Sequence, residues 1–407
     1  MARKFDINSP MLHVVMYAIL LFFTPFILLR SYLQDAIGRA STASFEVFGV
    51  SIPYVLVAAG VVFAILILRF GRYLTLRRVV AFAVVVLLWL LGQKTADYYF
   101  GHRFYELQHN WHYIAYALFV LVIYRACLAR KTRDARFALW AFLLPLGVST
   151  LDEVFQFFIS SRVFDIGDIA KDTWGAVIGI VFVFFVIKSG KIVEKGWKLR
   201  NAKPAEYIRN PLSITLLSAI FAYSLLFFGS ILTEVRYIGP AIGISLGIFV
   251  LIFLVIHLSQ MKAYRILFSA ILVMAILAQG TAFAVYHDDY IVKSSESITI
   301  YKGVPIPYFD VMIYPNGCFR LVDKKEAFNQ RDMLFFYEHA ESILLIAGGF
   351  DGAGGMGFPK EWESQFIFNP QTGKGLQVII QSTPTACKTF NRLKEEGKDV
   401  LFVVHST

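Results

Sequence analysis

Acidic side chains recur in the stretch from Ser149 to Gly179, although most of its other residues are apolar. A charge at the centre of a membrane costs about 2.5–3.5 kcal/mol on insertion scales, so such residues usually face a bundle interior, pair with one another or line a pathway. Several of them close together predict a site. Its candidate residues in this stretch are Asp152, Glu153, Gln156, Arg162, Asp168 and Asp172.

The spacing of the later carboxylates predicts one face of a helix. Asp168 and Asp172 are followed by Gly175 and Gly179, at positions i, i+4, i+7 and i+11. Glycines on such a face allow a neighbouring helix to approach closely. We therefore expect this face to pack against another helix, with its aspartates nearer the membrane surface.

Two more pairs have the spacing of one helical turn. Asp152 and Gln156 form one pair, and His112 and Tyr116 form the other in an earlier apolar run. We expect these pairs and the later aspartates to converge at one edge of the membrane. Arg162 would supply the countercharge.

Three interpretations of this cluster remain open. It is an ion-paired clamp that closes the loop between the fifth and sixth apolar segments, a binding site, or a catalytic or metal site. Carboxylates and His suit a divalent cation by ligand type, but their spacing is not diagnostic of a metal. We expect no cofactor and no resident metal, and an enzymatic activity is the less favoured interpretation.

The elements that must position these residues are membrane helices. The 407 residues are 57% hydrophobic and 17% charged, with a mean hydropathy of +0.60, whereas soluble domains are roughly 45–50% apolar and 25% charged. A span takes roughly 20 apolar residues. We expect a polytopic α-helical membrane protein with about nine spans, at 11–33, 52–69, 79–93, 110–128, 137–160, 166–187, 211–233, 238–258 and 266–286.

The positive charge of the chain indicates its orientation rather than a nucleic-acid partner. Lys and Arg are concentrated near the N-terminus and in the stretches 69–78, 125–136, 188–209 and 262–265, between apolar runs. Such loops stay in the cytoplasm. We expect a multi-pass protein of the bacterial cytoplasmic membrane, with a cytoplasmic N-terminus and, for nine spans, a C-terminal tail outside.

A small soluble α/β domain is expected from residue 288 onward, where apolar runs shorten to strand length. Asn316-Gly317 is a strong hairpin signal. Expected strands are Ser297–Tyr301, Phe309–Tyr314, Cys318–Val322, Ile343–Ala347, Leu376–Gln381 and Val400–Val404, and expected helices are Gln330–Ala340 and Thr383–Glu396. The chain thus divides into 1–70, 71–190, 191–287 and 288–407.

Two features of the tail invite chemical interpretations that we do not favour. Gly352-x-Gly354-x-x-Gly357 has the form of a dinucleotide fingerprint, but Pro359 follows at once and no strand-helix-strand unit surrounds it. Cys387 near a helix start suggests a reactive thiol, yet a buried packing cysteine is the better interpretation.

The polar residues of the membrane part resemble the VanZ family over roughly residues 75–190. The likeness is carried by Asp152-Glu153-x-x-Gln156, Arg162, Asp168, Gly175, Gly179 and His112-x-x-x-Tyr116. Asp172 stands where the family usually has Asn, and His109 stands where a Lys is common. The resemblance implies an envelope protein linked, in the named member, to low-level resistance against a lipid-tailed glycopeptide antibiotic.

The tail resembles a different family, the small α/β domain of the adipogenesis-associated protein and of a mitochondrial complex I assembly factor. The likeness covers roughly 290–407 and is carried by Thr383, Ala386, Cys387, Thr389, Phe390, Asn391 and the closing stretch Gly397 to His405. It implies an interaction module without catalytic residues, joined to a membrane protein as a fusion.

Together these patterns favour a non-enzymatic envelope protein. Its outer-edge site would bind a lipid-linked or amphipathic ligand, such as a membrane lipid, a lipid-linked cell-wall precursor or a glycopeptide, while the tail recruits a protein partner. A membrane enzyme doing metal-assisted chemistry on lipid headgroups is one alternative. A structural scaffold is the other.

Overall fold

The chain forms two compact units. The computed structural model describes residues 8–23, 30–97, 104–159, 164–193, 200–287, 290–352, 354–358, 364–369 and 374–406. The first unit contains Met1–Ala96, His102–Ser230 and Ile238–Gln260, and the second contains Asp97–Gly101, Ile231–Tyr237 and Met261–Thr407. The loop 231–237 thus belongs to the same unit as the C-terminal domain. The four-part division by sequence is finer and stays a prediction.

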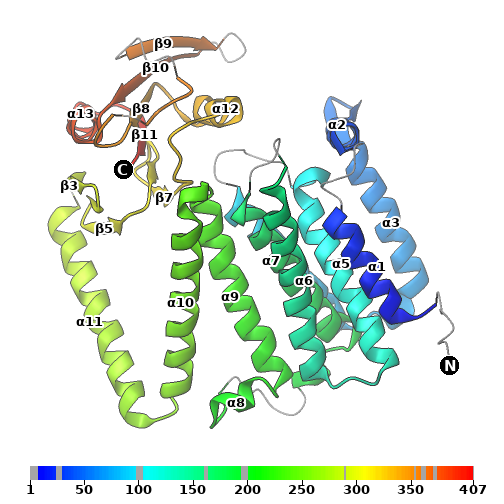
Figure 1. Cartoon of the computed structure of the whole chain (residues 1–407). Coiled ribbons are helices and arrows are strands. Elements are labelled where there is room, and N and C mark those ends of the chain that lie inside the picture. Colours follow the sequence, from blue (N-terminus) through cyan, green and yellow to red (C-terminus); the bar gives the residue numbers. More distant parts are fainter. Residues whose placement is uncertain are drawn as a thin grey trace. The chain divides into compact units, whose positions relative to one another are not determined.

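Eight helices in the described residues are long and apolar enough to cross a membrane (Figure 1). They are α3 (Tyr54–Phe70), α4 (Leu76–Ala96), α5 (Leu107–Ala129), α6 (Asp134–Gln156), α7 (Ile166–Val181, continued by the π-helical turn Phe182–Ile187), α9 (Pro211–Ile231), α10 (Ile238–Leu258) and α11 (Lys262–Tyr286). The protein is therefore a mostly helical membrane protein. The expected segments 79–93 and 166–187 correspond to helical stretches of 21 and 22 residues, Leu76–Ala96 and Ile166–Ile187.

The first expected span, 11–33, differs from the structure. Helix α1 (Pro10–Phe23) has 14 residues, a second helix α2 (Arg30–Thr42) follows, and residues 24–29 lie outside the described residues. Fourteen residues rise about 21 Å, which is less than the roughly 30 Å of hydrocarbon. The count of nine spans is therefore not confirmed.

Short elements that the sequence did not predict join the long helices. After α2 comes an antiparallel hairpin, β1 (Ser44–Val47) and β2 (Val50–Pro53), whose turn residues Phe48 and Gly49 both have positive φ. Phe48 is an unusual residue for such a turn, which explains why the hairpin carried no sequence signal. The remaining short helices are the 3-10 turns Gly71–Tyr73, Lys191–Val193 and Val235–Tyr237, and α8 (Pro204–Tyr207).

Helix α7 lies against α5 at backbone distance. A Cβ placed on Gly175 would lie 2.9 Å from the Tyr113 carbonyl oxygen, and one on Gly179 would lie 2.9 Å from that of Ala117. Real Cβ atoms do not approach backbone so closely, so these positions accept only glycine without a shift of a helix. The predicted close packing of this face is confirmed, and its partner is α5.

A second glycine stripe behaves differently. Gly239, Gly243 and Gly247 recur every four residues in α10, a spacing typical of close helix packing. Nothing lies within 4 Å of a Cβ placed at any of the three, as far as the structure describes the chain. The close packing that this spacing suggests is therefore not made by the described residues.

We predict that Gly175→Ala lowers the stability of the protein and that Gly243→Ala does not. The first change forces α5 and α7 apart, which should lower the free energy of unfolding by about 1–3 kcal/mol. The second change adds a methyl group in open space. The free energy of unfolding, measured by titration with a denaturing detergent, tests this. Equal values for the two variants would contradict the described packing.

The second unit contains a mixed sheet of six strands in the order β7-β6-β11-β8-β10-β9. The three strands β8, β10 and β11 are parallel, and the outer pairs are antiparallel. Bounds are β6 (Val311–Ile313), β7 (Phe319–Leu321), α12 (Gln330–His339), β8 (Ile343–Ala347), β9 (Ser364–Asn369), β10 (Lys374–Gln381), α13 (Thr383–Glu395) and β11 (Val400–Val404). The small sheet predicted for the tail is thus present.

A separate three-stranded meander precedes this sheet. It consists of β3 (Ile291–Ser295), β4 (Ile298–Tyr301) and β5 (Val304–Pro307). Asn391 of α13 fixes the meander, because its side-chain amide donates to the carbonyl oxygen of Ile291 and accepts from the Ile291 N–H, both at 3.0 Å. The start of β3 is therefore held against α13.

Helix α13 covers the parallel strands and buries Cys387. The thiol is 6% exposed in the hydrophobic core of the domain, and this burial raises its pKa to about 11. The interpretation as a buried packing cysteine is thus supported. At the start of this helix, Ser382 occupies the N-cap position, and the Thr383 hydroxyl donates to the His405 carbonyl oxygen at 2.7 Å.

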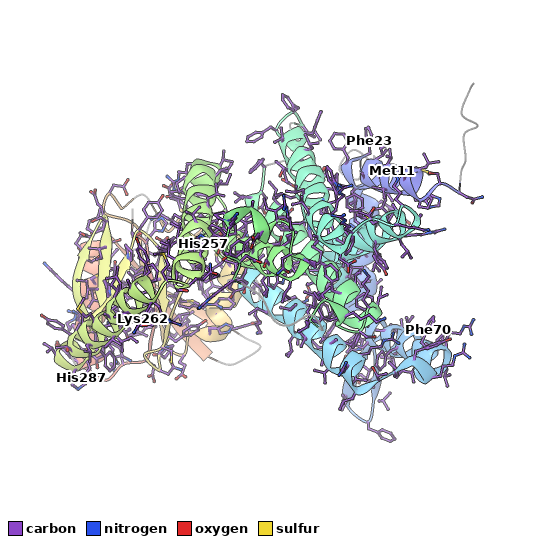
Figure 2. The ribbon with its side chains drawn as sticks, turned by 90° about the horizontal axis from the view of Figure 1, so that it is seen from below. Met11, Phe23, Phe70, His257, Lys262 and His287 are labelled. Atoms are coloured by element: carbon purple, nitrogen blue, oxygen red, sulfur yellow. The ribbon has the colours of Figure 1, made fainter. Side chains whose placement is uncertain are left out.

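Helix α11 leads into this domain and exposes its apolar surface. None of its residues is buried, and Figure 2 shows its side chains projecting along the helix between the labelled Lys262 and His287. Near its end, the Gln279 side chain donates to the carbonyl oxygen of Gly303 at 3.0 Å. Gly303 has a φ of +74° and a Cβ there would lie 2.5 Å from the Ala282 carbonyl oxygen. The turn between β4 and β5 is thus attached to α11.

Candidate functional site

The predicted polar faces meet at one end of α5, α6 and α7, and α7 packs against both other helices. His112 Nδ1 of α5 lies 2.8 Å from Asp172 Oδ1 of α7. The Ser149 hydroxyl of α6 donates to the other oxygen, Asp172 Oδ2, at 2.7 Å. One carboxylate therefore joins three helices.

The glycine contact described above sets this geometry. A Cβ on Gly175 would lie 3.1 Å from the His112 carbonyl oxygen, and Gly175 lies one turn after Asp172 along α7. The close approach of the two backbones therefore holds the imidazole opposite the Asp172 carboxylate.

A second carboxylate of α7 lies on the other side of the imidazole. His112 Nε2 is 3.6 Å from Asp168 Oδ1, and Lys171 Nζ is 2.8 Å from the same oxygen. Both ring nitrogens of His112 thus face a carboxylate. Lys171 supplies the positive charge that this part of the cluster needs, because buried charges are stable only when paired.

The cluster is open at one side. The side chains of His112 and Asp168 are 27% and 28% exposed, whereas that of Asp172 is only 6% exposed. The His112–Asp168 pair is therefore the part of the cluster that a molecule from outside can reach. It offers ring N–H groups and carboxylate oxygens side by side, which together can bind hydroxyl, amide or amine groups.

Glu153 forms a distinct buried part of the cluster. Its Oε2 accepts from the backbone N–H of Asp165 at 3.0 Å, and its Oε1 accepts from Gln156 Nε2 at 2.6 Å. The contact joins the end of α6 to the residue before α7. Glu153, bonded also to Gln156, therefore joins α6 to the start of α7 by hydrogen bonds, and the ion-paired clamp stays a prediction.

Asp165 continues this connection as the N-cap of α7. Its Oδ1 accepts from the Gly167 N–H at 2.7 Å, which satisfies one of the free amides of the first turn. Burial, together with the nearby Asp168 carboxylate, raises the pKa of the Asp165 carboxyl above its ordinary value.

The remaining predicted residues lie around this core. Tyr116 is buried and its hydroxyl interacts with Ser149 and Asp172. Asp152 is half-buried and acts electrostatically on Glu153 and Tyr116. Arg162, the expected countercharge, lies outside the described residues, so its role stays a prediction.

Three participants were missed as site residues by the sequence reasoning: Ser149, Asp165 and Lys171. Signals for them existed. Ser149 precedes Glu153 and Gln156 at the spacing i, i+4 and i+7, so these three share the buried face of α6. The sequence pairing of Asp152 with Gln156 chose the neighbouring face, and the observed partner of Gln156 is Glu153.

A metal centre was one open interpretation of this cluster. Within the described residues, no group of three or more His, Cys, Asp or Glu side chains is arranged to hold a metal ion. The Asp172 carboxylate already contacts His112 and Ser149. Its negative charge thus lies beside an imidazole that can carry the opposite charge.

Comparison with known families supports the VanZ-like part of the sequence analysis. Residues 11–188 match the VanZ/LLP1 family. The match covers less than half of the chain and includes α1, which contacts α5 through a hydrogen bond from the Tyr17 hydroxyl to the Ala115 carbonyl oxygen. The VanZ-like part therefore begins earlier than the sequence motifs indicated.

The comparisons leave the C-terminal domain without an assigned family. No curated protein and no solved structure matches the chain. The resemblance of the tail to the adipogenesis-associated and complex I assembly factor domain therefore stays a prediction.

We predict that Glu153→Leu lowers the free energy of unfolding by about 2–3 kcal/mol, because it removes a charged acceptor from the Asp165 N–H and the Gln156 amide. The matched control is Thr150→Ala on the exposed side of α6, whose hydroxyl bonds only to the Leu146 carbonyl oxygen in its own helix. We expect the control to lower the free energy of unfolding by less than about 0.5 kcal/mol. Titration with a denaturing detergent measures both, and a similar loss for the two variants would exclude the clamp.

Proposed function

We propose that this protein is a non-enzymatic membrane protein of the cell envelope that binds the polar head of a lipid-linked or amphipathic ligand. The observation that carries the proposal is the partial exposure of His112 and Asp168 beside buried, mutually bonded partners. A ligand with an apolar tail can lie along the helices while its head reaches this pair. Membrane lipids, lipid-linked cell-wall precursors and lipid-tailed glycopeptides all have this form.

The chemistry of the pair favours a headgroup rich in hydroxyl, amide or amine groups. Asp168 offers carboxylate oxygens as acceptors, and the His112 ring and the Lys171 ammonium offer donors. Asp172, Ser149 and Glu153 already have protein partners, which suits a binding surface that is fixed before the ligand arrives. Glycopeptide resistance or envelope maintenance is the role that the VanZ likeness suggests.

A metal-assisted enzyme is the weaker alternative. The two imidazole nitrogens of His112 face Asp172 and Asp168, so a bound metal would have to displace one of these contacts. The described residues favour a hydrogen-bonded binding surface over a catalytic centre.

We expect His112→Gln and Asp168→Asn to reduce bound lipid and antibiotic tolerance at unchanged expression. The measurements are lipid that co-purifies with the protein, identified by mass spectrometry, and the susceptibility of cells to a lipid-tailed glycopeptide. We expect about a tenfold loss of binding, since a hydrogen bond to a charged group contributes about 1.5–3 kcal/mol.

The control for this experiment is Asp134→Asn. Asp134 pairs with Lys188 at the opposite end of α6, so it changes a charge without touching the proposed site. The proposal fails if the His112→Gln and Asp168→Asn variants bind as much lipid, and give cells as much antibiotic tolerance, as this control.

We propose that the site and the C-terminal domain face the outside of a bacterial cytoplasmic membrane. The basic loops after α3, α5, α7 and α10 support this orientation. Counted from these loops, the proposed side of the domain is the same whether or not α1 crosses the membrane. If α1 does not cross, the side of the N-terminus changes and that of the tail does not.

A periplasmic-type reporter fused after Asp289 should therefore be active. A cytoplasmic-type fluorescent reporter at the same position should be dark. A matched fusion in the basic loop at Lys131 should give the opposite pattern, since that loop follows α5. An inactive periplasmic-type reporter after Asp289, together with a fluorescent cytoplasmic-type reporter at the same position, would contradict the proposed orientation.

A further inference from the structure

Three basic loops of the first unit meet at one end of its helices. One joins α3 to α4, one joins α5 to α6, and one follows α7. Arg78, in the first turn of α4, connects the first loop to the third, because its Nη1 donates to the Tyr73 carbonyl oxygen at 2.7 Å and its Nε donates to the Ser189 hydroxyl at 2.9 Å. Lys188 of the third loop pairs with Asp134 at the start of α6. The three loops therefore form one surface.

The exposed side chains of this surface are strongly cationic. Within the described stretches 71–78, 125–136 and 188–193, the only acidic residue is Asp134, and Lys188 already neutralises it. Six exposed cations form no ion pair with another described residue, and we call them the basic surface: Arg72, Arg77, Arg130, Lys131, Arg133 and Arg136. Their charges are therefore available to a partner outside the chain.

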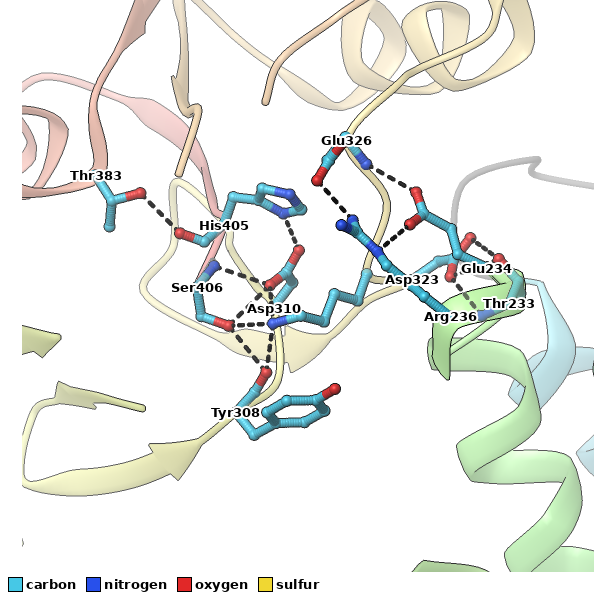
Figure 3. A network of polar contacts seen from close by, with 11 residues as sticks. Thr233, Glu234, Arg236, Tyr308, Asp310, Asp323, Glu326, Thr383, His405 and Ser406 are labelled. Atoms are coloured by element: carbon cyan, nitrogen blue, oxygen red, sulfur yellow. Dashed lines mark hydrogen bonds and ion pairs between the residues drawn. The ribbon is translucent and has the colours of Figure 1, made fainter. Parts of the chain in front are cut away.

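Basic residues of the second unit differ in this respect (Figure 3). Arg236 bonds to Glu234 at 2.8 Å and to Glu326 at 2.7 Å. Lys324 is buried, and its ammonium lies 3.6 Å from Asp310 Oδ1. These cations are matched by acidic groups of their own unit, whereas those of the basic surface are not.

Helix α6 continues the basic surface with an exposed stripe. Arg133, Arg136, Trp140 and Leu143 recur at i, i+3, i+7 and i+10, so they lie on one side of the helix. Trp140 is 46% exposed and Leu143 is 44% exposed, whereas Ala138 on the opposite side is fully buried. A cation at the helix end, an aromatic ring one turn deeper and then an apolar side chain follow the order of a membrane from headgroup to acyl chain.

A phospholipid with a net negative charge matches both parts of this surface. Its phosphate can accept paired N–H bonds from the guanidinium groups of Arg133 and Arg136, and its acyl chains can lie against Trp140 and Leu143. A zwitterionic phospholipid has the same phosphate, but the neighbouring cations repel its ammonium group. Charge therefore favours the anionic class.

We propose that the basic surface and the exposed stripe of α6 bind anionic phospholipids of the surrounding membrane. This site lies at the opposite end of α5 and α7 from the His112–Asp168 pair, because that pair belongs to the first turns of these helices and the basic loops follow their last turns. The site goes beyond the proposed function and does not rest on it.

The test is native mass spectrometry of the full-length protein in detergent, titrated with phosphatidylglycerol or with phosphatidylcholine. We expect the wild type to bind phosphatidylglycerol more tightly. Arg133→Gln and Arg136→Gln should each weaken its binding about fivefold, the effect of one cation beside an anionic lipid surface, and should change phosphatidylcholine binding less. Arg136→Lys, which keeps the charge, should retain most of the affinity.

The matched control is Arg39→Gln, which removes an exposed arginine of α2 in the same unit but outside the basic surface. It should leave phosphatidylglycerol binding unchanged. Because the side chains of Arg133 and Arg136 are exposed, their variants should unfold at the wild-type temperature, which separates lost binding from lost structure.

Three results would overturn the proposal. Equal affinity of the wild type for the two lipids would show that the surface does not select negative charge. Unchanged phosphatidylglycerol binding by both glutamine variants would show that α6 does not carry the site. An equal loss in Arg39→Gln would show that binding follows the net charge of the protein. Since these variants leave His112 and Asp168 intact, failure here is distinguishable from failure of the proposed function.

Discussion

Helices α5 and α7 approach one another closely because Gly175 and Gly179 leave room for the backbone of α5. A hydrocarbon environment gives little hydrophobic reward for helix association, so such backbone-to-backbone packing is a main source of specific contact. Here it also decides the polar chemistry. With the helix axes at this separation, His112 reaches Asp172, and Ser149 of α6 reaches the same carboxylate. Larger residues at the glycines would separate the groups that neutralise one another.

This packing separates two groups of residues within one cluster. Glu153, Gln156 and Asp165 are bonded to backbone and side-chain groups between the end of α6 and the start of α7. His112 and Asp168 remain partly exposed. The bonded group and the proposed binding pair are therefore adjacent but distinct.

The helical faces could be predicted from sequence because spacing alone decides which residues share a face. The Asp168, Asp172, Gly175 and Gly179 face was predicted with the correct close packing. Partner choice could not be predicted, since Asp152 and Glu153 are adjacent in sequence and only the packing of α6 shows that Glu153 is the buried one. For the same reason, Lys171 was not recognised as the partner of Asp168.

Predictions for the C-terminal domain succeeded where apolar runs were buried and failed at its edges. Strands β8 and β11 are fully buried and gave clear signals, whereas β5 contains two prolines and three of the five residues of β3 are polar. The first expected membrane segment, 11–33, was not confirmed. Its apolar composition satisfied the length rule, but the described helix α1 covers only Pro10–Phe23.

The order of strands in the six-stranded sheet has a consequence for biosynthesis. Strand β11 follows all the other described strands in the chain, yet it lies in the middle of the sheet between β6 and β8. During synthesis, β6 and β8 therefore leave the ribosome before the strand that joins them. The six-stranded sheet cannot close until β11 has emerged.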